Sequence, residues 1–406
     1  MSKAGEDDAV AALAEHIGRR VERRAAAVAC GTHALHDGYT DLIYVMLPLW
    51  QAEFAIGYAA LGLMRGLFTG VMAAFQVPAG ALGARLGTAP VLAAGTALVG
   101  GAYCLAGTSS GLALLTAALL IGGLGASTQH PLAAALMARA FTGARSLKAL
   151  GTYNFSGDLG KMTLPAAAGL MLTILPWRPT LALLGALGIA AAASIFVLTP
   201  RLKPAQRGTP SAEQTNQAVG ARRFRFGFPI LLTIGVFDSA TRMAFLTFLP
   251  LLLVQKGASV TTVGFALTLV FAGGAAGKLV CAFVGARLGV IATVWFTEVL
   301  TTLTILALLP SPLDAVLLLL PVVGIALNGT SSVLYGSVPI LVEPSRHTQA
   351  FGMFYTGTIG AGAVAPALYG LLGDHIGLKH ALVLIAVGAL VTVPLAAALR
   401  PVFART

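Results

Sequence analysis

Long apolar runs alternate with short polar connections along almost the whole chain. Each run is about 20 residues long, which suits an α-helix that crosses a bilayer with a rise of 1.5 Å per residue. Strand-like alternation at roughly ten-residue spacing is absent from the sequence, so a membrane β-barrel is not favoured. The pattern predicts twelve spans, at residues 26–50, 57–78, 89–107, 111–138, 149–175, 180–198, 227–255, 260–284, 289–309, 313–341, 349–372 and 380–399.

One long polar stretch lies inside the chain, at residues 199–226. It is basic, contains Pro, Ser, Gln and Thr, and is interpreted as a flexible cytoplasmic linker. The linker divides the chain into an N-terminal six-helix bundle at 25–198 and a C-terminal one at 227–400. Residues 1–24 form a polar, partly amphipathic N-terminal segment on the cytoplasmic side, and residues 401–406 form a cytoplasmic tail.

Composition and charge placement support a bilayer as the surrounding solvent. The chain is 57% hydrophobic and only 10% charged, whereas a soluble domain carries roughly 25% charged residues. The net charge of +11 could indicate a nucleic-acid partner, but most of the 26 Lys and Arg residues lie on the side of both termini, and only Arg178, Lys256 and Lys379 lie opposite. By the positive-inside rule both termini are cytoplasmic. We therefore expect a monomeric, multi-pass protein of a bacterial inner membrane, with lipid contacts and no nucleic-acid partner.

The two sides of the linker are related to each other. Residues 83–87, Gly-Ala-Arg-Leu-Gly, recur at 285–289, displaced by 202 positions. At a displacement of 201 the matches are Asp37 with Asp238, Gly123 with Gly324, Arg145 with Arg346, Gly151 with Gly352, Pro165 with Pro366, and Gly169 with Gly370. Matches at a nearly constant offset indicate duplication. The predicted fold class is an all-α membrane protein of twelve helices in two pseudo-symmetric six-helix bundles.

The loop between the second and third spans resembles the signature of the major facilitator superfamily, approximately G-x-L-x-D-R-x-G-R/K. Residues 80–87 read Gly-Ala-Leu-Gly-Ala-Arg-Leu-Gly. Ala84 occupies the acidic position and the final basic residue is missing, so the interhelical charge contact that this motif makes in the family lacks its acidic member here. The resemblance implies the twelve-helix fold of that superfamily.

Within the superfamily the chain is most similar to the fosmidomycin-resistance family of drug exporters. The similarity rests on residues 129–131 (Gln-His-Pro) and the following basic loop, on Gly157, Gly160 and Pro165, and on Arg242 followed by residues 248–251 (Phe-Leu-Pro-Leu). Leu132 stands where that family usually has an acidic residue, and Lys161 and Lys278 are unexpected. The resemblance implies export of small polar or amphipathic compounds.

Charged residues within the predicted spans are the main functional candidates, because a charge near the bilayer centre costs about 2.5–3.5 kcal/mol on insertion scales. In the first span, His33, Asp37 and Asp41 are spaced i, i+4 and i+8, and Tyr44 follows. This spacing places them on one helical face. Asp37 and Asp41 are candidates for proton exchange, with a satisfied structural acid as the alternative.

The seventh and fifth spans carry further charges. Asp238, also a proton-coupling candidate, and Arg242 occupy the positions of Asp37 and Asp41 in the second half. They form either an intrahelical ion pair or a pair in which Arg242 reaches Asp41 across the halves. Asn154, Asp158 and Lys161 share one face, as substrate contacts or as a local Asp–Lys pair.

His130, next to Pro131, has three possible roles: hydrogen bonding within the bundle, proton or substrate binding, or metal ligation with His33 and Asp37. Substrate contacts are predicted for His33, Tyr44, Asn154, Asp158, Lys161, Arg242, Asn328 and Tyr355. Gating or packing roles are predicted for Arg65, Arg85, Lys278, Arg287 and Glu298.

These features predict a secondary transporter that moves a small solute by alternating access, coupled to protons, with export favoured. The alternatives are uptake of an organic anion or of a transition-metal ion, and a non-transporting membrane receptor or scaffold. No nucleophile, nucleotide-loop or cofactor motif is found, so an enzyme is not expected, and neither a cofactor nor a resident metal is assigned.

Overall fold

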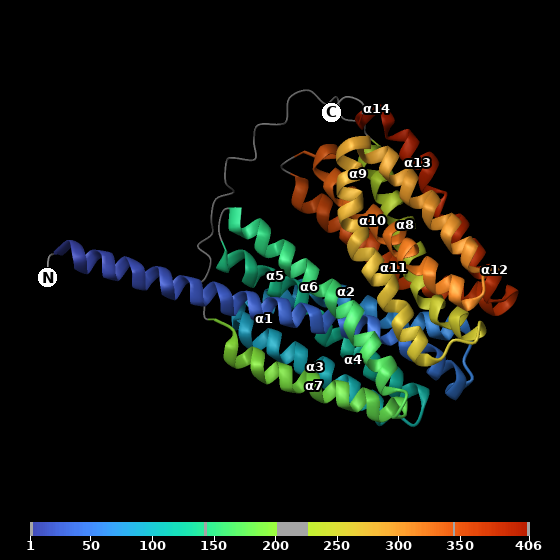
Figure 1. Ribbon diagram of the computed structural model, residues 1–406, viewed down its shortest axis with the longest axis horizontal. Helices are drawn as coiled ribbons and strands as arrows, with labels where there is room; N and C mark the ends of the chain where they lie inside the picture. Colours follow the sequence, from blue (N-terminus) through green and yellow to red (C-terminus); the bar gives the residue numbers. More distant parts are fainter. Residues whose placement is uncertain (1–2, 142–143, 201–225, 344–345, 404–406) are drawn as a thin grey trace.

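The computed structural model describes residues 3–403 except 142–143, 201–225 and 344–345, and these residues form helices joined by short connections (Figure 1). The helices are α1 (Lys3–Phe54), α2 (Tyr58–Leu86), α3 (Thr88–Gly107), α4 (Leu112–Ala126), α5 (Gln129–Ala140), α6 (Ala144–Met171), α7 (Trp177–Leu198), α8 (Gly227–Gln255), α9 (Val260–Leu308), α10 (Leu313–Leu341), α11 (His347–Ile376), α12 (Leu378–Ala389), α13 (Thr392–Ala398) and α14 (Arg400–Phe403). Most of the predicted linker, 199–226, lies outside the described residues.

The helices correspond to the twelve predicted spans. Among the described residues, nine stretches are long and apolar enough to cross a membrane; α4 and α5 together form one, α12 and α13 form another, and α9 supplies two. The two spans within α9 meet at Gly289, whose φ of 80° interrupts the helix. The other three spans lie in α1, α6 and α11; α1 and α6 have lower hydropathy because they carry the charges of the candidate site.

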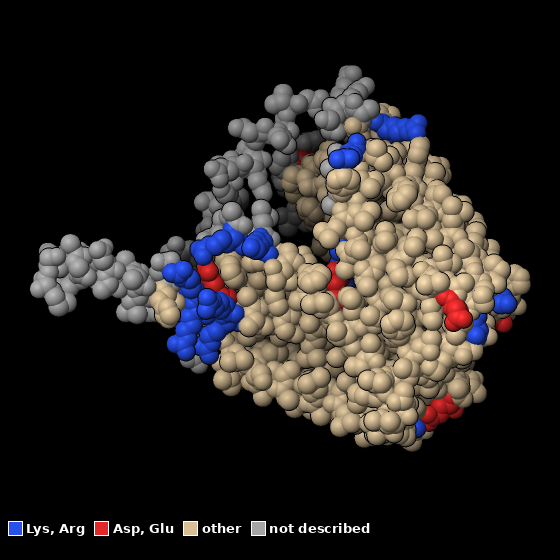
Figure 2. Space-filling view, in the orientation of Figure 1, with Lys and Arg blue, Asp and Glu red and all other residues tan. Residues whose placement is uncertain are grey.

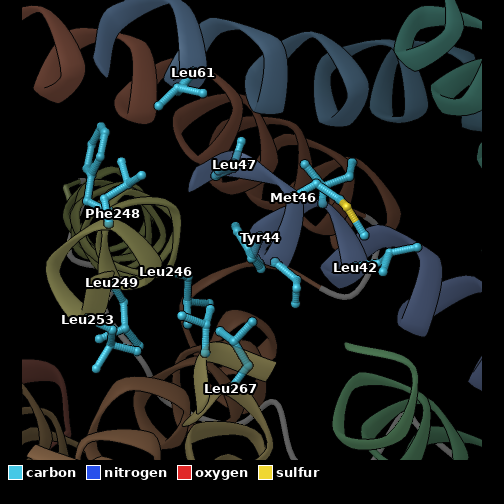
Figure 3. Packing of buried hydrophobic residues seen from close by; sticks show 14 of the residues in the cluster. Leu42, Tyr44, Met46, Leu47, Leu61, Leu246, Phe248, Leu249, Leu253 and Leu267 are labelled. Carbon is cyan, nitrogen blue, oxygen red and sulfur yellow. The ribbon is translucent and has the colours of Figure 1, made fainter. Parts of the chain in front are cut away.

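The two six-helix halves are joined at one end and separated at the other. At the joined end, which contains the connections at 55–57, 256–259 and 377, a single buried apolar cluster combines residues of α1, α2, α8 and α9 (Figure 3). Toward the opposite end, the N-terminal half has its own cluster around Leu136, and the C-terminal half has another around Leu334. Two separate cores mean that the halves diverge, and we call this the open end.

Figure 2 shows a hollow between the halves at the open end, with charged side chains along its wall. Two groups of basic side chains surround this end. Their position is that of the side predicted to face the cytoplasm.

Contact between backbones holds the joined end together. A Cβ atom at Gly62 would lie 2.1 Å from the Pro366 carbonyl oxygen, and one at Gly66 would lie 2.2 Å from that of Ala363. Side chains larger than hydrogen therefore do not fit between α2 and α11 here. Close approach of this kind is how helices associate in a bilayer, where van der Waals packing replaces the hydrophobic effect.

Gly66→Ala should separate α2 from α11, because the new methyl group collides with backbone that cannot rotate away. Overpacking of a tight interface costs about 1–3 kcal/mol, so the melting temperature of the purified protein in detergent should fall. Gly70→Ala is the matched control, since a Cβ there would meet its nearest neighbour, the Ala363 Cβ, at 3.8 Å. Equal melting temperatures for the two variants would contradict the tight contact.

Candidate functional site

The first functional group of residues surrounds Asp37 on α1. Its Oδ2 lies 3.3 Å from Lys161 Nζ on α6 and 3.5 Å from His33 Nε2, one turn earlier on α1. The three side chains come together because α6 packs directly on α1: a Cβ at Gly160 would lie 1.8 Å from the Ala34 carbonyl oxygen. Asp37 and His33 are buried, whereas the Lys161 side chain keeps 32% of its surface exposed.

Three imidazoles gather on the side of Asp37 away from Asp41. The His130 ring on α5 lies 5.4 Å from the His33 ring and 4.7 Å from the His36 ring, between centroids. His33 also stacks on Tyr153 at 4.1 Å, and its Nδ1 lies 2.8 Å from the Tyr153 carbonyl oxygen. The predicted proximity of His33 and His130 is thus present, with hydrogen bonding, proton binding and metal ligation all still possible for His130.

His36 belongs to this group, with its Nε2 3.9 Å from Asp37 Oδ1, but it was not among the predicted residues. It follows His33 by three positions and directly precedes Asp37. The signal in the sequence was therefore a second histidine next to the acid, within reach of the same helical face.

Asp41 has a different partner from the one considered across the halves. Arg65 on α2 is buried, and its Nη2 lies 3.7 Å from Asp41 Oδ1 and donates to the Tyr44 hydroxyl at 3.2 Å. Its guanidinium also lies over the Tyr44 ring, 4.8 Å from the centroid. In this conformation the cation beside Asp41 is thus Arg65 rather than Arg242, so Arg65 belongs to the intramembrane network in addition to its predicted gating role.

Asp158 joins the two halves. Both of its carboxylate oxygens lie 2.7 Å from Lys278 Nζ on α9. Lys161, three residues further along α6, points instead to Asp37. The alternative of a local Asp158–Lys161 pair is therefore not what the structure contains, because each of these residues has its closest opposite charge on another helix.

The second half has a smaller group around Asp238. Arg242 Nη2 lies 3.9 Å from Asp238 Oδ2, which is the predicted intrahelical pair. Glu298 on α9 lies against Asp238, and both carboxyls are buried. Arg242 Nε and Glu298 Oε1 are among the buried polar atoms of the described residues that have no hydrogen-bond partner, and so is the Tyr153 hydroxyl beside His33 in the first group.

The remaining predicted residues do not join either group. Asn154 is exposed on α6, and Asn328 donates to the Gly324 carbonyl of its own helix at 3.2 Å. Tyr355 is 50% exposed and packs on Tyr335, with ring centroids 4.6 Å apart. Arg85 and Arg287 are exposed, and Arg287 lies 4.3 Å from the centroid of the Phe283 ring.

The sequence of the chain matches a known family over both halves. The family model described as the major facilitator superfamily matches residues 29–257 and, again, residues 231–404. The chain belongs to the major facilitator superfamily. This is a family of membrane transporters rather than of enzymes, and the predicted superfamily and fold class are confirmed.

Two curated relatives are bacterial drug-resistance proteins. The chain is 25% identical over 224 residues to the multidrug resistance protein MdtL of Escherichia coli O127:H6, which covers 54% of the chain and 56% of that protein. The chain thus spans about half the length of MdtL. It is also 25% identical over 363 residues to the fosmidomycin resistance protein of Escherichia coli K12, with 85% of each chain covered.

Solved structures of transporters share the fold. A bacterial homolog of the human lysosomal transporter Spinster, in an inward-facing and unoccupied conformation, has a TM-score of 0.79 at 15% identity and covers 95% of this chain and 98% of its own. A single-residue mutant of the nucleoside transporter NupG has a TM-score of 0.75 at 15% identity, with 94% of this chain and all of that chain covered.

The Asp41–Arg65 pair should behave as a coupled unit. Asp41→Asn leaves a buried guanidinium without its carboxylate, and Arg65→Met leaves a buried carboxylate without its cation; breaking a buried pair in this way costs about 3–5 kcal/mol. The double variant removes both charges, so its melting temperature in detergent should fall by clearly less than the sum of the two single effects. Additive losses would show that the two charges do not interact.

Proposed function

We propose that this protein is a proton-coupled secondary transporter that exports a small polar or amphipathic solute by alternating access. Both termini and the open end would then face the cytoplasm. The two halves that rock would be residues 25–198 and 227–400, joined by the linker at 199–226. A monomer contains all of the proposed machinery. The names of the two curated relatives, both resistance proteins, support export as the direction.

The proton site of this proposal is Asp37 together with His33. Asp37 has one partly exposed cationic neighbour, Lys161, and two buried imidazole neighbours, His33 and His36. Protonation of Asp37 would remove its attraction for Lys161 and free the ammonium group toward the hollow. A solute with an anionic group could then bind Lys161, so the proton and the solute favour each other's binding and are coupled through this residue.

The exposed atoms near the hollow favour a solute with an anionic group. The Lys161, Lys278 and Arg242 side chains keep 32%, 42% and 18% of their surface exposed, whereas their acidic partners Asp37, Asp158 and Asp238 keep 11% or less. In each pair the cation is therefore more accessible from the hollow than its acidic partner. This placement supports the organic-anion class of solute, in either direction of transport.

Alternating access requires that the joined end opens, and one contact there is well suited to be its latch. At the end of α11, Asp374 accepts hydrogen bonds at 2.6 Å and 3.0 Å from the backbone N–H groups of Tyr58 and Ala59, the first two residues of α2. No side chain within α2 caps its N-terminus. A carboxylate from the other half therefore satisfies the free donors and the positive end of the helix dipole.

The latch has a sequence signal that was not used in the prediction. Residues 370–377, Gly-Leu-Leu-Gly-Asp-His-Ile-Gly, repeat the Gly-x-Leu-Gly spacing of residues 80–87 and supply an acid where the earlier segment has Ala84. Both segments end a helix with a glycine at positive φ, 97° at Gly87 and 85° at Gly377. The acid missing from the loop predicted to be cytoplasmic is thus present at the opposite end of the molecule.

Asp37→Asn should abolish proton-driven flux and preserve exchange. The probes are fosmidomycin and a panel of small organic anions, and the protein is reconstituted inside-out in proteoliposomes. An imposed pH gradient should drive uptake of the probe by the unmodified protein only. Counterflow, which needs no net proton movement, should persist in the variant. Asp314→Asn is the matched control, because Asp314 is an exposed carboxylate at the start of α10. Gradient-driven flux that survives Asp37→Asn would overturn the assignment.

Asp374→Ala should favour opening of the joined end. A helix cap contributes about 1 kcal/mol, which corresponds to roughly a fivefold shift between two conformations. The measurement is the labelling rate of Phe248→Cys by a membrane-impermeant maleimide added from outside, in a background without Cys30, Cys104 and Cys281. Phe248 is buried at the joined end, 6.2 Å from Tyr58 between ring centroids.

Labelling should accelerate in Asp374→Ala and stay unchanged in Asp314→Ala, which removes a carboxylate of the same side without touching α2. Equal labelling rates in the two variants would show that Asp374 does not hold the joined end closed.

A further inference from the structure

The two nitrogens of His33 have different surroundings, and together they define what can lie beside Asp37. Nδ1 is 2.8 Å from the Tyr153 carbonyl oxygen, which can only accept, so Nδ1 carries a hydrogen. Unless the ring is protonated, Nε2 then directs a lone pair at Asp37 Oδ2, 3.5 Å away. A lone pair and a carboxylate repel each other, so a positively charged species belongs between these two atoms.

A proton on Nε2 satisfies this requirement, and so does a metal ion. One ligand atom from each of His33, Asp37 and His130 can be chosen so that all three lie within 4.8 Å of one another. Two ligands at 2.0–2.2 Å from a tetrahedral zinc lie about 3.4 Å apart, close to the His33–Asp37 separation. These two are also spaced i, i+4, the spacing by which one helix presents two ligands to one metal ion. His130 would have to come closer to complete the set, because the three ligand atoms lie within 4.8 Å of one another rather than about 3.4 Å apart.

The surroundings favour a transition metal over Mg²⁺ or Ca²⁺. Imidazole and carboxylate together suit zinc, nickel, cobalt and copper, whereas the alkaline-earth ions prefer an all-oxygen set. The Tyr153 carbonyl orients the His33 ring as an outer-sphere acceptor does in metal sites. His36, 3.9 Å from the other Asp37 oxygen, provides an additional imidazole beside the same carboxylate.

Lys161 is the internal competitor for this position. Its ammonium group is 3.3 Å from Asp37 Oδ2, the oxygen that also faces His33. A divalent ion and an ammonium at the same oxygen repel each other strongly in a medium of low dielectric constant. Lys161 is part exposed and can swing away from Asp37, so metal entry would release it in the same way as protonation.

We propose that His33, Asp37 and His130 form a binding site for a divalent transition-metal ion, which takes the place of the proton between His33 and Asp37. Three protein ligands leave a coordination position open for water or another small ligand. The site lies within one half and does not depend on which solute is transported.

The test uses purified, tag-free protein in detergent, with Co²⁺ as a spectroscopic probe and Zn²⁺ in calorimetry. Co²⁺ should give visible d–d absorption that Zn²⁺ displaces, and Mg²⁺ should not compete. His130→Gln removes a direct ligand and should weaken Zn²⁺ binding by at least the roughly tenfold to hundredfold that loss of an outer-shell partner costs. Lys161→Gln should strengthen it by about tenfold or more, because the competing charge is gone.

His380→Gln is the matched control, since His380 is an exposed histidine on α12 outside the group. It should leave the Co²⁺ spectrum unchanged. Absence of Co²⁺ absorption in the unmodified protein would overturn the site, and so would binding that is the same in His130→Gln. Zinc affinity that stays constant or falls in Lys161→Gln would show that the ion does not bind at Asp37.

One consequence rests on the proposed function: a metal at Asp37 excludes the proton, so Zn²⁺ should inhibit gradient-driven flux by the unmodified protein, with His130→Gln less sensitive. The binding measurements need no solute. Failure of the metal site and failure of the transport proposal are therefore separately visible.

Discussion

A charge inside a bilayer requires a partner, and the pairing of such charges determines how the helices of this transporter are arranged around its centre. Asp37, Asp41, Asp158 and Asp238 each lie beside a cation, and for the first three that cation comes from another helix. Because an unpaired charge in hydrocarbon is costly, these contacts hold α1 to α2 and α6, and α6 to α9. The same requirement makes each pair sensitive to anything that neutralises one partner. A proton on a carboxylate both removes a charge and frees its cation.

The halves combine this network with two different kinds of end. Two features hold the halves together at the joined end. The backbones of α2 and α11 are in direct contact at Gly62 and Gly66, and one buried apolar cluster combines residues of both halves. At the open end each half keeps its own core. The Asp158–Lys278 pair is an ionic contact between the halves, and Asp374 reaches from the second half to the start of α2. A rocking motion of the two halves therefore has to break and re-form these specific contacts.

Much of the fold followed from the sequence because apolar runs, basic loops and the 201–202-residue repeat are one-dimensional patterns. The i, i+4 spacing likewise placed His33, Asp37 and Asp41 on one face. Partner choice did not follow, because it depends on how neighbouring helices are rotated and how closely they approach. Lys161 reaches Asp37 rather than Asp158 because Gly157 and Gly160 bring α6 against α1. The pairing of Arg65 with Asp41 depends on the position of α2 beside α1, which the sequence pattern does not give.

The central claim is that proton binding at Asp37 and solute binding at Lys161 favour each other, and proton uptake on solute binding tests it most directly. Purified protein in weakly buffered detergent with a pH indicator would receive fosmidomycin or an anionic compound shown to bind by thermal shift. The account predicts that the unmodified protein takes up protons when it binds the compound, and that Asp37→Asn binds the compound without that uptake. Solute binding without proton uptake in the unmodified protein, or equal uptake in Asp37→Asn, would contradict it.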